Sequence, residues 1–156
     1  MKATTILSRC RNAEADMRRL KQRIQQRREA AECITPTLDG VGGGRGAGGP
    51  DKIGALVAGI DELERKLRAR EEARNVEVAA ACVLLDTLPG SESAVLHAYY
   101  IRRDKMEAVA KRMGLSDGYA RKLKADAEKQ LDSLSDEQVA ATLPAWYLRG
   151  KDERPD

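Results

Sequence analysis

Apolar residues recur at spacings of three and four along two long stretches of the chain. The first series is Cys10, Ala13, Met17, Leu20, Ile24, Ala31 and Ile34. The second is Ile53, Leu56, Ile60, Leu63 and Leu67, and it resumes at Val78, Ala81 and Leu85. These spacings are those of a heptad seam, so we predict helices over residues 3–34 and 51–86. Each helix would be about 45–55 Å long and could not bury its apolar stripe alone.

A glycine-rich stretch separates the two series. Seven of the thirteen glycines lie between Gly40 and Gly49, a density that predicts a flexible loop over residues 36–50. No Gly-Lys-Ser/Thr follows, which argues against a phosphate-binding P-loop. Because short connections usually join antiparallel neighbours, we expect residues 1–88 to form an antiparallel helical hairpin, a coiled coil. Pairing of either helix with a second copy of the chain remains an alternative.

The chain after residue 88 is broken into short helices. Pro89 and Gly90 end the long helix, and a helix is expected over residues 91–101. Residues 104–107 read as a capping box that opens the next helix, which ends at Gly114. Ser116 caps a further helix to about Leu131, and residues 135–138 form a second capping box before a short terminal helix. We therefore expect a domain over residues 89–134 and a short helix with a tail over residues 135–156.

Composition supports an all-α fold. Phe is absent, aromatic residues make up 3% of the chain and charged residues 34%, which argues against sandwiches, barrels and doubly wound α/β folds. No apolar run approaches the roughly 20 residues that span a bilayer, and no signal peptide is recognised. Three scattered cysteines predict neither a disulfide framework nor a zinc site. We expect a soluble, cytoplasmic protein without membrane contact.

The net charge of +3 is distributed unevenly. Residues 1–35 carry nine Lys/Arg and four Asp/Glu, and residues 89–131 carry nine and six, so both stretches are basic. Residues 51–88 carry six against eight, and residues 132–156 carry three against six. The two basic stretches are candidates for anionic partners.

Residues 106–123 fit a helix-turn-helix. Ala110 is the small residue where two helices would cross, and Gly114 lies where a left-handed turn would cost other residues about 1 kcal/mol or more. Apolar contacts are expected from Val109, Met113, Leu115, Ala120 and Leu123. The second helix would then expose a polar and basic face, as a recognition helix in the major groove requires. An ordinary helical bundle with a solvated cationic face is the alternative.

The expected DNA-binding residues surround this second helix. They are Ser116, Asp117, Gly118, Tyr119, Arg121, Lys122, Lys124, Arg102, Arg103 and Lys105. Arg121 is the candidate for a bidentate contact with guanine, whereas Lys124, Lys105 and Arg103 are assigned to phosphates. A lone histidine, His97, and the lack of nucleophile–base or metal-ligand spacings predict no catalysis, no metal and no cofactor.

The same region resembles region 4 of bacterial sigma factors. The resemblance rests on Glu92–Leu96, Tyr99–Ile101, Met106–Ser116 and Ala127–Leu131, and it covers about residues 88–132. It implies a four-helix DNA-binding unit that also contacts RNA polymerase. The whole layout is similar to small phage and prophage regulators of the late-gene activator type. Nothing resembles the other sigma regions, and Ala120 stands where a branched residue is usual.

These observations predict a sequence-specific, double-stranded DNA-binding transcriptional regulator, phage or prophage encoded, that is not an enzyme. RNA polymerase and a second copy of the chain, bound through the hairpin, are candidate partners. One alternative is a phage small terminase subunit, which a ring of roughly eight or more subunits would favour; another is a helical scaffold without DNA binding. In the tail, Trp146 and Tyr147 are expected to pack on the helix-turn-helix core, with a contact for a partner protein as the alternative.

Overall fold

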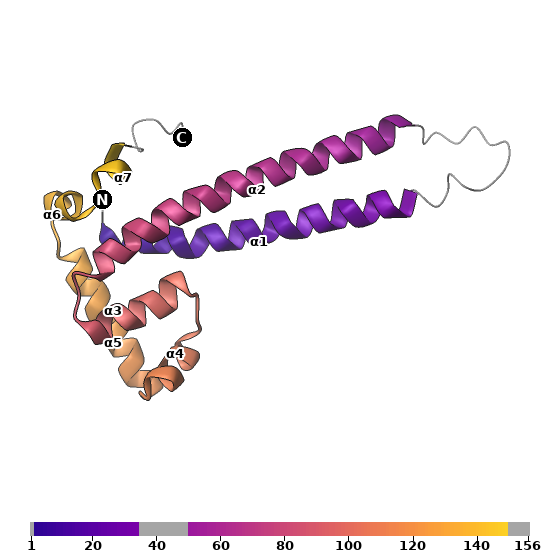
Figure 1. The fold of residues 1–156 in the computed structure, drawn as a ribbon. Coiled ribbons are helices and arrows are strands. Elements are labelled where there is room, and N and C mark those ends of the chain that lie inside the picture. The colour runs from indigo at the N-terminus through magenta and orange to yellow at the C-terminus, as the bar shows by residue number, and fades with distance from the viewer. Residues whose placement is uncertain (1, 35–49, 150–156) are drawn as a thin grey trace, which may run out of the picture. The chain divides into compact units, whose positions relative to one another are not determined.

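The computed structural model describes residues 2–34 and 50–149, and this part of the chain is helical without any strand. The all-α prediction is therefore confirmed. The helices, labelled in Figure 1, are α1 (Ala3–Ile34), α2 (Pro50–Leu85), α3 (Gly90–Leu96), a π-helical turn η2 (His97–Ile101), α4 (Met106–Met113), α5 (Asp117–Asp132), α6 (Asp136–Thr142) and α7 (Ala145–Arg149). No helix among the described residues has the length and apolar character needed to cross a bilayer.

The backbone contacts divide the chain into two compact units. Unit 1 comprises residues 1–13 and 73–156, and unit 2 comprises residues 14–72. Both α1 and α2 therefore contribute residues to each unit. Residues 36–49 of the predicted glycine-rich loop lie outside the described residues, and residue 50, its predicted last residue, belongs to α2.

In unit 2, α1 and α2 lie side by side and run in opposite directions (Figure 1). Two ion pairs follow this direction: Lys21 contacts Glu71 at 3.3 Å between Nζ and Oε1, and Arg28, seven residues further along α1, contacts Glu64, seven residues earlier in α2. Met17, Ile24 and Leu63 are buried between the two helices. The apolar stripes thus bury each other's central residues, which neither helix could do alone.

Unit 1 has a core built from segments that are far apart in the sequence. The first turns of α1 contribute Ile6, Leu7 and Cys10, and the end of α2 contributes Leu84 and Leu85. They pack with side chains from α3, η2, α5, α6 and the C-terminal segment, namely Leu96, Tyr100, Ala127, Leu131, Val139, Leu143 and Tyr147. The core therefore extends across residue 88, the predicted end of the first domain.

Most helix ends follow the local sequence. The second long helix stops at Leu85, four residues before Pro89. Ser135 accepts from the backbone N–H of Gln138, and the Gln138 side chain accepts from the backbone N–H of Ser135, so this capping box is confirmed. The prediction of a capping box at residues 104–107 is wrong, because the N-cap of α4 is Lys105 and no side chain caps this helix. The Asp104 carboxylate is instead engaged by nearby guanidinium groups.

The tail differs from expectation in which aromatic residue docks. Tyr147 in α7 is 2% exposed, and its hydroxyl donates to Glu77 Oε2 at 2.7 Å. Trp146 is 47% exposed. Tyr147 therefore packs in the core formed with the start of α1 and the end of α2, and not in the helix-turn-helix core as expected, because its buried hydroxyl finds the Glu77 carboxylate there. The indole of Trp146 remains at the surface. Burial and this hydrogen bond raise the pKa of Tyr147 above its usual range.

Candidate nucleic-acid interface

Helices α4 and α5 are joined by a tight left-handed turn. Gly114 has φ 67° and ψ 30°, which confirms the expected left-handed position. Its N–H donates to the carbonyl of Lys111 at 3.3 Å, and the N–H of Leu115 donates to the carbonyl of Ala110 at 2.9 Å. This pair of bonds is a Schellman motif, which satisfies the last carbonyls of α4. Two residues later, Ser116 Oγ accepts from the backbone N–H of Tyr119 at 3.2 Å and caps α5.

The two helices share a small core. Val95, Met106, Val109, Ala110 and Ala120 are buried together, and Met113, Leu115 and Leu123 pack against them. Five of these side chains are the expected apolar contacts of the motif. Ala120 is completely buried, and its small size allows α5 to pack closely against its neighbours at this point.

The outer side of the first turns of α5 is open. Six of the predicted binding residues are exposed here: Ser116, Asp117, Gly118, Tyr119, Arg121 and Lys122. Asp117 and Arg121 form one i,i+4 row, and Gly118 and Lys122 form the adjacent row, so these four share one face. A Cβ at Gly118 would meet nothing within 4 Å. Tyr119 is 52% exposed.

Lys124 differs from the other predicted residues. Its side chain is 20% exposed and its ammonium group donates to Glu128. The same Nζ lies 4.5 Å from the ring centre of Tyr99 and 5.5 Å from that of Tyr100. Tyr100 also donates to Glu128, and burial together with this carboxylate raises the pKa of Tyr100 above its usual range. Lys124 is thus held by a carboxylate and two aromatic rings, away from the outer row of α5.

The remaining predicted cations lie before α4. Arg102 and Lys105 are exposed, and Arg102 Nε is 3.6 Å from Asp104 Oδ2. Arg103 has φ 64°, and its buried Nε has no hydrogen-bond partner among the described residues. Asp104 also accepts from Arg112 of α4. This second bond ties the 102–105 segment to α4 and explains why Asp104 does not cap the helix.

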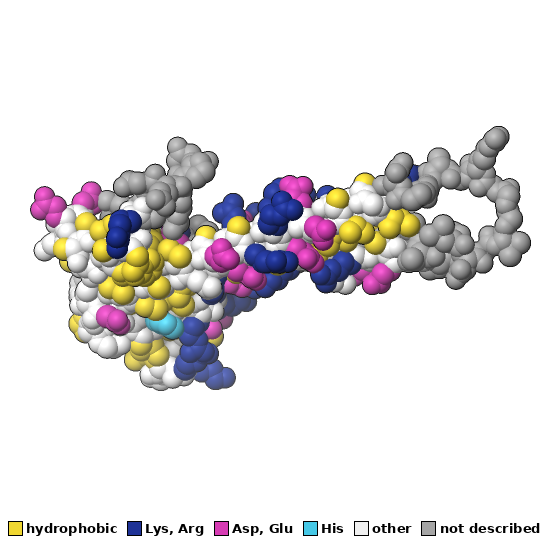
Figure 2. All heavy atoms as spheres, turned by 45° about the horizontal axis from the view of Figure 1, so that its top comes forward, with side chains coloured by type: hydrophobic (Ala, Val, Ile, Leu, Met, Phe, Trp, Pro, Cys, Tyr) yellow, Lys and Arg dark blue, Asp and Glu magenta, His cyan; other side chains and the backbone are white. Residues whose placement is uncertain are grey.

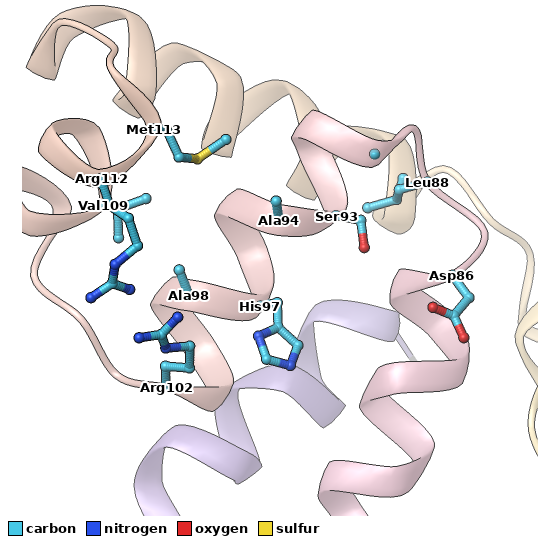
Figure 3. A pocket seen from close by; sticks show the side chains of 11 residues that line it. Asp86, Leu88, Ser93, Ala94, His97, Ala98, Arg102, Val109, Arg112 and Met113 are labelled. Carbon is cyan, nitrogen blue, oxygen red and sulfur yellow. The ribbon is translucent and has the colours of Figure 1, made fainter.

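A surface groove adjoins this segment. It has a volume of about 490 Å³, and its floor is largely apolar, with Leu88, Ala94, Ala98, Val109 and Met113. Figure 3 shows the guanidinium groups of Arg102 and Arg112 turned toward each other at one end of the groove. His97 lies along its wall (Figure 3). In Figure 2, a group of Lys and Arg side chains lies next to this histidine.

Two residues outside the predicted set, Arg11 and Tyr99, contact each other beside Lys124 of α5. Arg11 of α1 lies 4.0 Å from the ring centre of Tyr99, measured from its Cζ, and donates to the Tyr99 carbonyl at 2.6 Å. Tyr99 is therefore contacted by both Arg11 and Lys124. The contact joins residues 88 positions apart in the sequence, so no local pattern could have indicated it. It connects the start of α1 to the side of α5.

In the described part of the chain, no group of three His, Cys, Asp or Glu side chains is arranged to hold a metal ion. The expected absence of catalysis stays a prediction. Comparison of the chain with protein-family models, with curated proteins and with solved structures yields no match.

Proposed function

We propose that the chain is a sequence-specific, double-stranded DNA-binding transcriptional regulator of phage or prophage origin, in which α5 enters the major groove. The α4–turn–α5 segment would act as a sigma region 4-like helix-turn-helix. Its site of action would be the cytoplasm of the bacterial host, with duplex DNA and RNA polymerase as partners. The pair of long helices in unit 2 would be a coiled-coil hairpin for self-association or for a protein partner.

One observation carries the proposal: the first turns of α5 are exposed and polar, while the opposite side of α5 is fixed to α4. Recognition helices contact base edges with residues near their N-terminus, and this end of α5 carries Ser116, Asp117, Gly118, Arg121 and Lys122. Gly118 has no side chain, so a base pair or the sugar-phosphate backbone can approach α5 closely there. Arg121 offers a planar fork that matches the two acceptors of guanine.

Phosphate contacts are assigned to cations around this helix. Lys105 and Arg102 are exposed on the segment that precedes α4. Arg103, on the same segment, is assigned with them; because its Nε is buried, its terminal guanidinium nitrogens would have to make the phosphate contact. Such contacts add affinity and register but no sequence information. Lys124 is a weaker candidate than the sequence suggested, because contact with a phosphate would compete with Glu128 and two tyrosine rings.

The test is selection of a preferred site from a random duplex library, followed by titration of variants on that site. Arg121→Ala should lose about 1–3 kcal/mol of binding free energy and relax the preference at one base pair. The control is Arg121→Lys, which keeps the charge but removes the bidentate fork, so it should keep the salt dependence while losing discrimination. If the native chain binds no duplex at low salt, or if Arg121→Ala leaves site preference unchanged, the proposal is wrong.

A further inference from the structure

The middle of α1 carries an unusual concentration of cations. Residues 18–28 contain Arg18, Arg19, Lys21, Arg23, Arg27 and Arg28 and no acidic residue. The acidic residues of this helix lie only before and after that stretch, at positions 14, 16, 29 and 32. The proposed contact of α5 with DNA makes no use of these side chains.

Only some of these cations are neutralised by neighbours. Lys21 and Arg28 face α2, where they pair with Glu71 and Glu64. Arg19 lies 3.8 Å from Asp16, but its side chain is 78% exposed, and such a pair contributes little. Arg18 and Arg23 form no ion pair with any residue in the described ranges 2–34 and 50–149.

The unneutralised cations lie on the outer side of α1. Arg18, Gln22 and Gln26 form one i,i+4 row, and Arg19 and Arg23 form the adjacent row. All five residues are exposed, whereas Met17 and Ile24 are buried on the side that faces α2. We name this surface the α1 basic face. The stretch 18–28 is about 16 Å long at 1.5 Å per residue, close to the length of five base pairs.

We infer that the α1 basic face binds the sugar-phosphate backbone of duplex DNA without sequence preference, as a second contact surface. This inference rests on the proposed function. The face presents guanidinium and amide groups, which are the donors that phosphate oxygens accept from. The acidic residues of α2 lie about one helix diameter away, close to the Debye length at physiological salt, so they reduce its potential only partly.

An acidic protein fits this face less well than DNA. Protein interfaces are built around a buried apolar or aromatic centre with a polar rim. The α1 basic face has no apolar side chain, because Met17 and Ile24 are buried on the other side of the helix. Binding that depends on charge and on hydrogen-bond donors alone is characteristic of phosphate backbones.

The experiment measures how duplex affinity of the full chain depends on salt concentration. A triple variant, Arg18→Gln with Arg19→Gln and Arg23→Gln, should lower the slope of log affinity against log salt by about two to three, since each lost phosphate contact lowers it by about 0.9. The matched control carries Lys52→Gln, Arg65→Gln and Arg70→Gln. It removes the same charge at exposed positions of α2 and should change the slope by less than one.

The outcomes separate the inference from the proposed function. If the native chain binds duplex DNA and Arg121→Ala weakens it, but both triple variants keep the native slope, the α1 basic face does not bind DNA and the proposed function stands. If both triple variants lower the slope equally, the effect is one of net charge and the inference is also wrong. Absence of duplex binding by the native chain would instead refute the proposed function. Circular dichroism of each variant should match the native chain, because all six residues are exposed.

Discussion

Gly114 and Gly118 allow the geometry of the α4–α5 turn to be tested with two substitutions of the same type. Both glycines lie in open space, since a Cβ at either position would meet nothing within 4 Å. They differ in backbone conformation: Gly114 has φ 67°, whereas Gly118 lies in the first turn of α5. Steric collision is therefore equal for the two sites, and only conformational preference differs.

The expected changes have opposite signs. Gly114→Ala should lower the free energy of unfolding by about 1–2 kcal/mol, because a Cβ is disfavoured in the left-handed region. Gly118→Ala should raise it by about 0.5–1 kcal/mol, because alanine loses less backbone entropy in a helix. The two variants should therefore differ by about 1.5–3 kcal/mol. Gly114→Asn should fall between the native chain and Gly114→Ala, since asparagine tolerates this conformation.

Urea unfolding followed by tryptophan fluorescence is a suitable assay. The chain has a single tryptophan, Trp146, and it belongs to unit 1, as do both glycines. The slope of the transition should stay constant so that the midpoints report stability. If Gly114→Ala were as stable as the native chain, the left-handed turn would be refuted. If Gly118→Ala lowered the free energy of unfolding as much as Gly114→Ala, the left-handed conformation at Gly114 would not be the cause of the destabilisation.

Three further predictions concern buried residues of unit 1 and of unit 2. Tyr147→Phe removes the donor to Glu77 and should cost about 1.5–3 kcal/mol in urea unfolding, since a hydrogen bond to a charged group is lost; an unchanged midpoint would contradict this. Leu63→Asp places a charge at a position where the native residue is only 6% exposed, so helicity and melting temperature measured by circular dichroism should fall strongly. A melting temperature equal to that of the native chain would show that Leu63 is not packed between α1 and α2. Burial raises the pKa of Cys10 to about 12, so at pH 8 a thiol reagent should modify the exposed Cys33 quickly and Cys10 only after unfolding.

The features that could be predicted from the sequence are those decided within a few residues. The left-handed turn at Gly114 and the caps at Ser116 and Ser135 depend on backbone preference and on side chains three residues away. The capping box at Asp104 failed because the same carboxylate has a competing partner eight residues later, Arg112. The local sequence therefore identifies residues that could cap a helix, but a charged neighbour in the fold can engage the same side chain instead.

Exposure was predictable on one face of α5 but not at its flank. Helical periodicity alone places Lys124 among the exposed positions. In the fold, Tyr99 and Tyr100 of η2 lie beside Lys124, and Glu128 accepts a hydrogen bond from its ammonium group. The Lys124 side chain is therefore only 20% exposed. Periodicity identifies the side of a helix but not which neighbouring helix will cover its edge.

Taken by itself, the sequence determined that the chain is helical, where the two long helices lie and how α4 turns into α5, because helix propensity, apolar spacing and capping act over one to four residues. Membership of the start of α1 and the end of α2 in the same core as α5 and α7 became visible only in the folded protein. Thr4 reaches Asp132 across 128 residues, and Tyr147 reaches Glu77 across 70. Contacts at such separations are selected by the shape and burial of the whole unit, which no local pattern in the chain encodes.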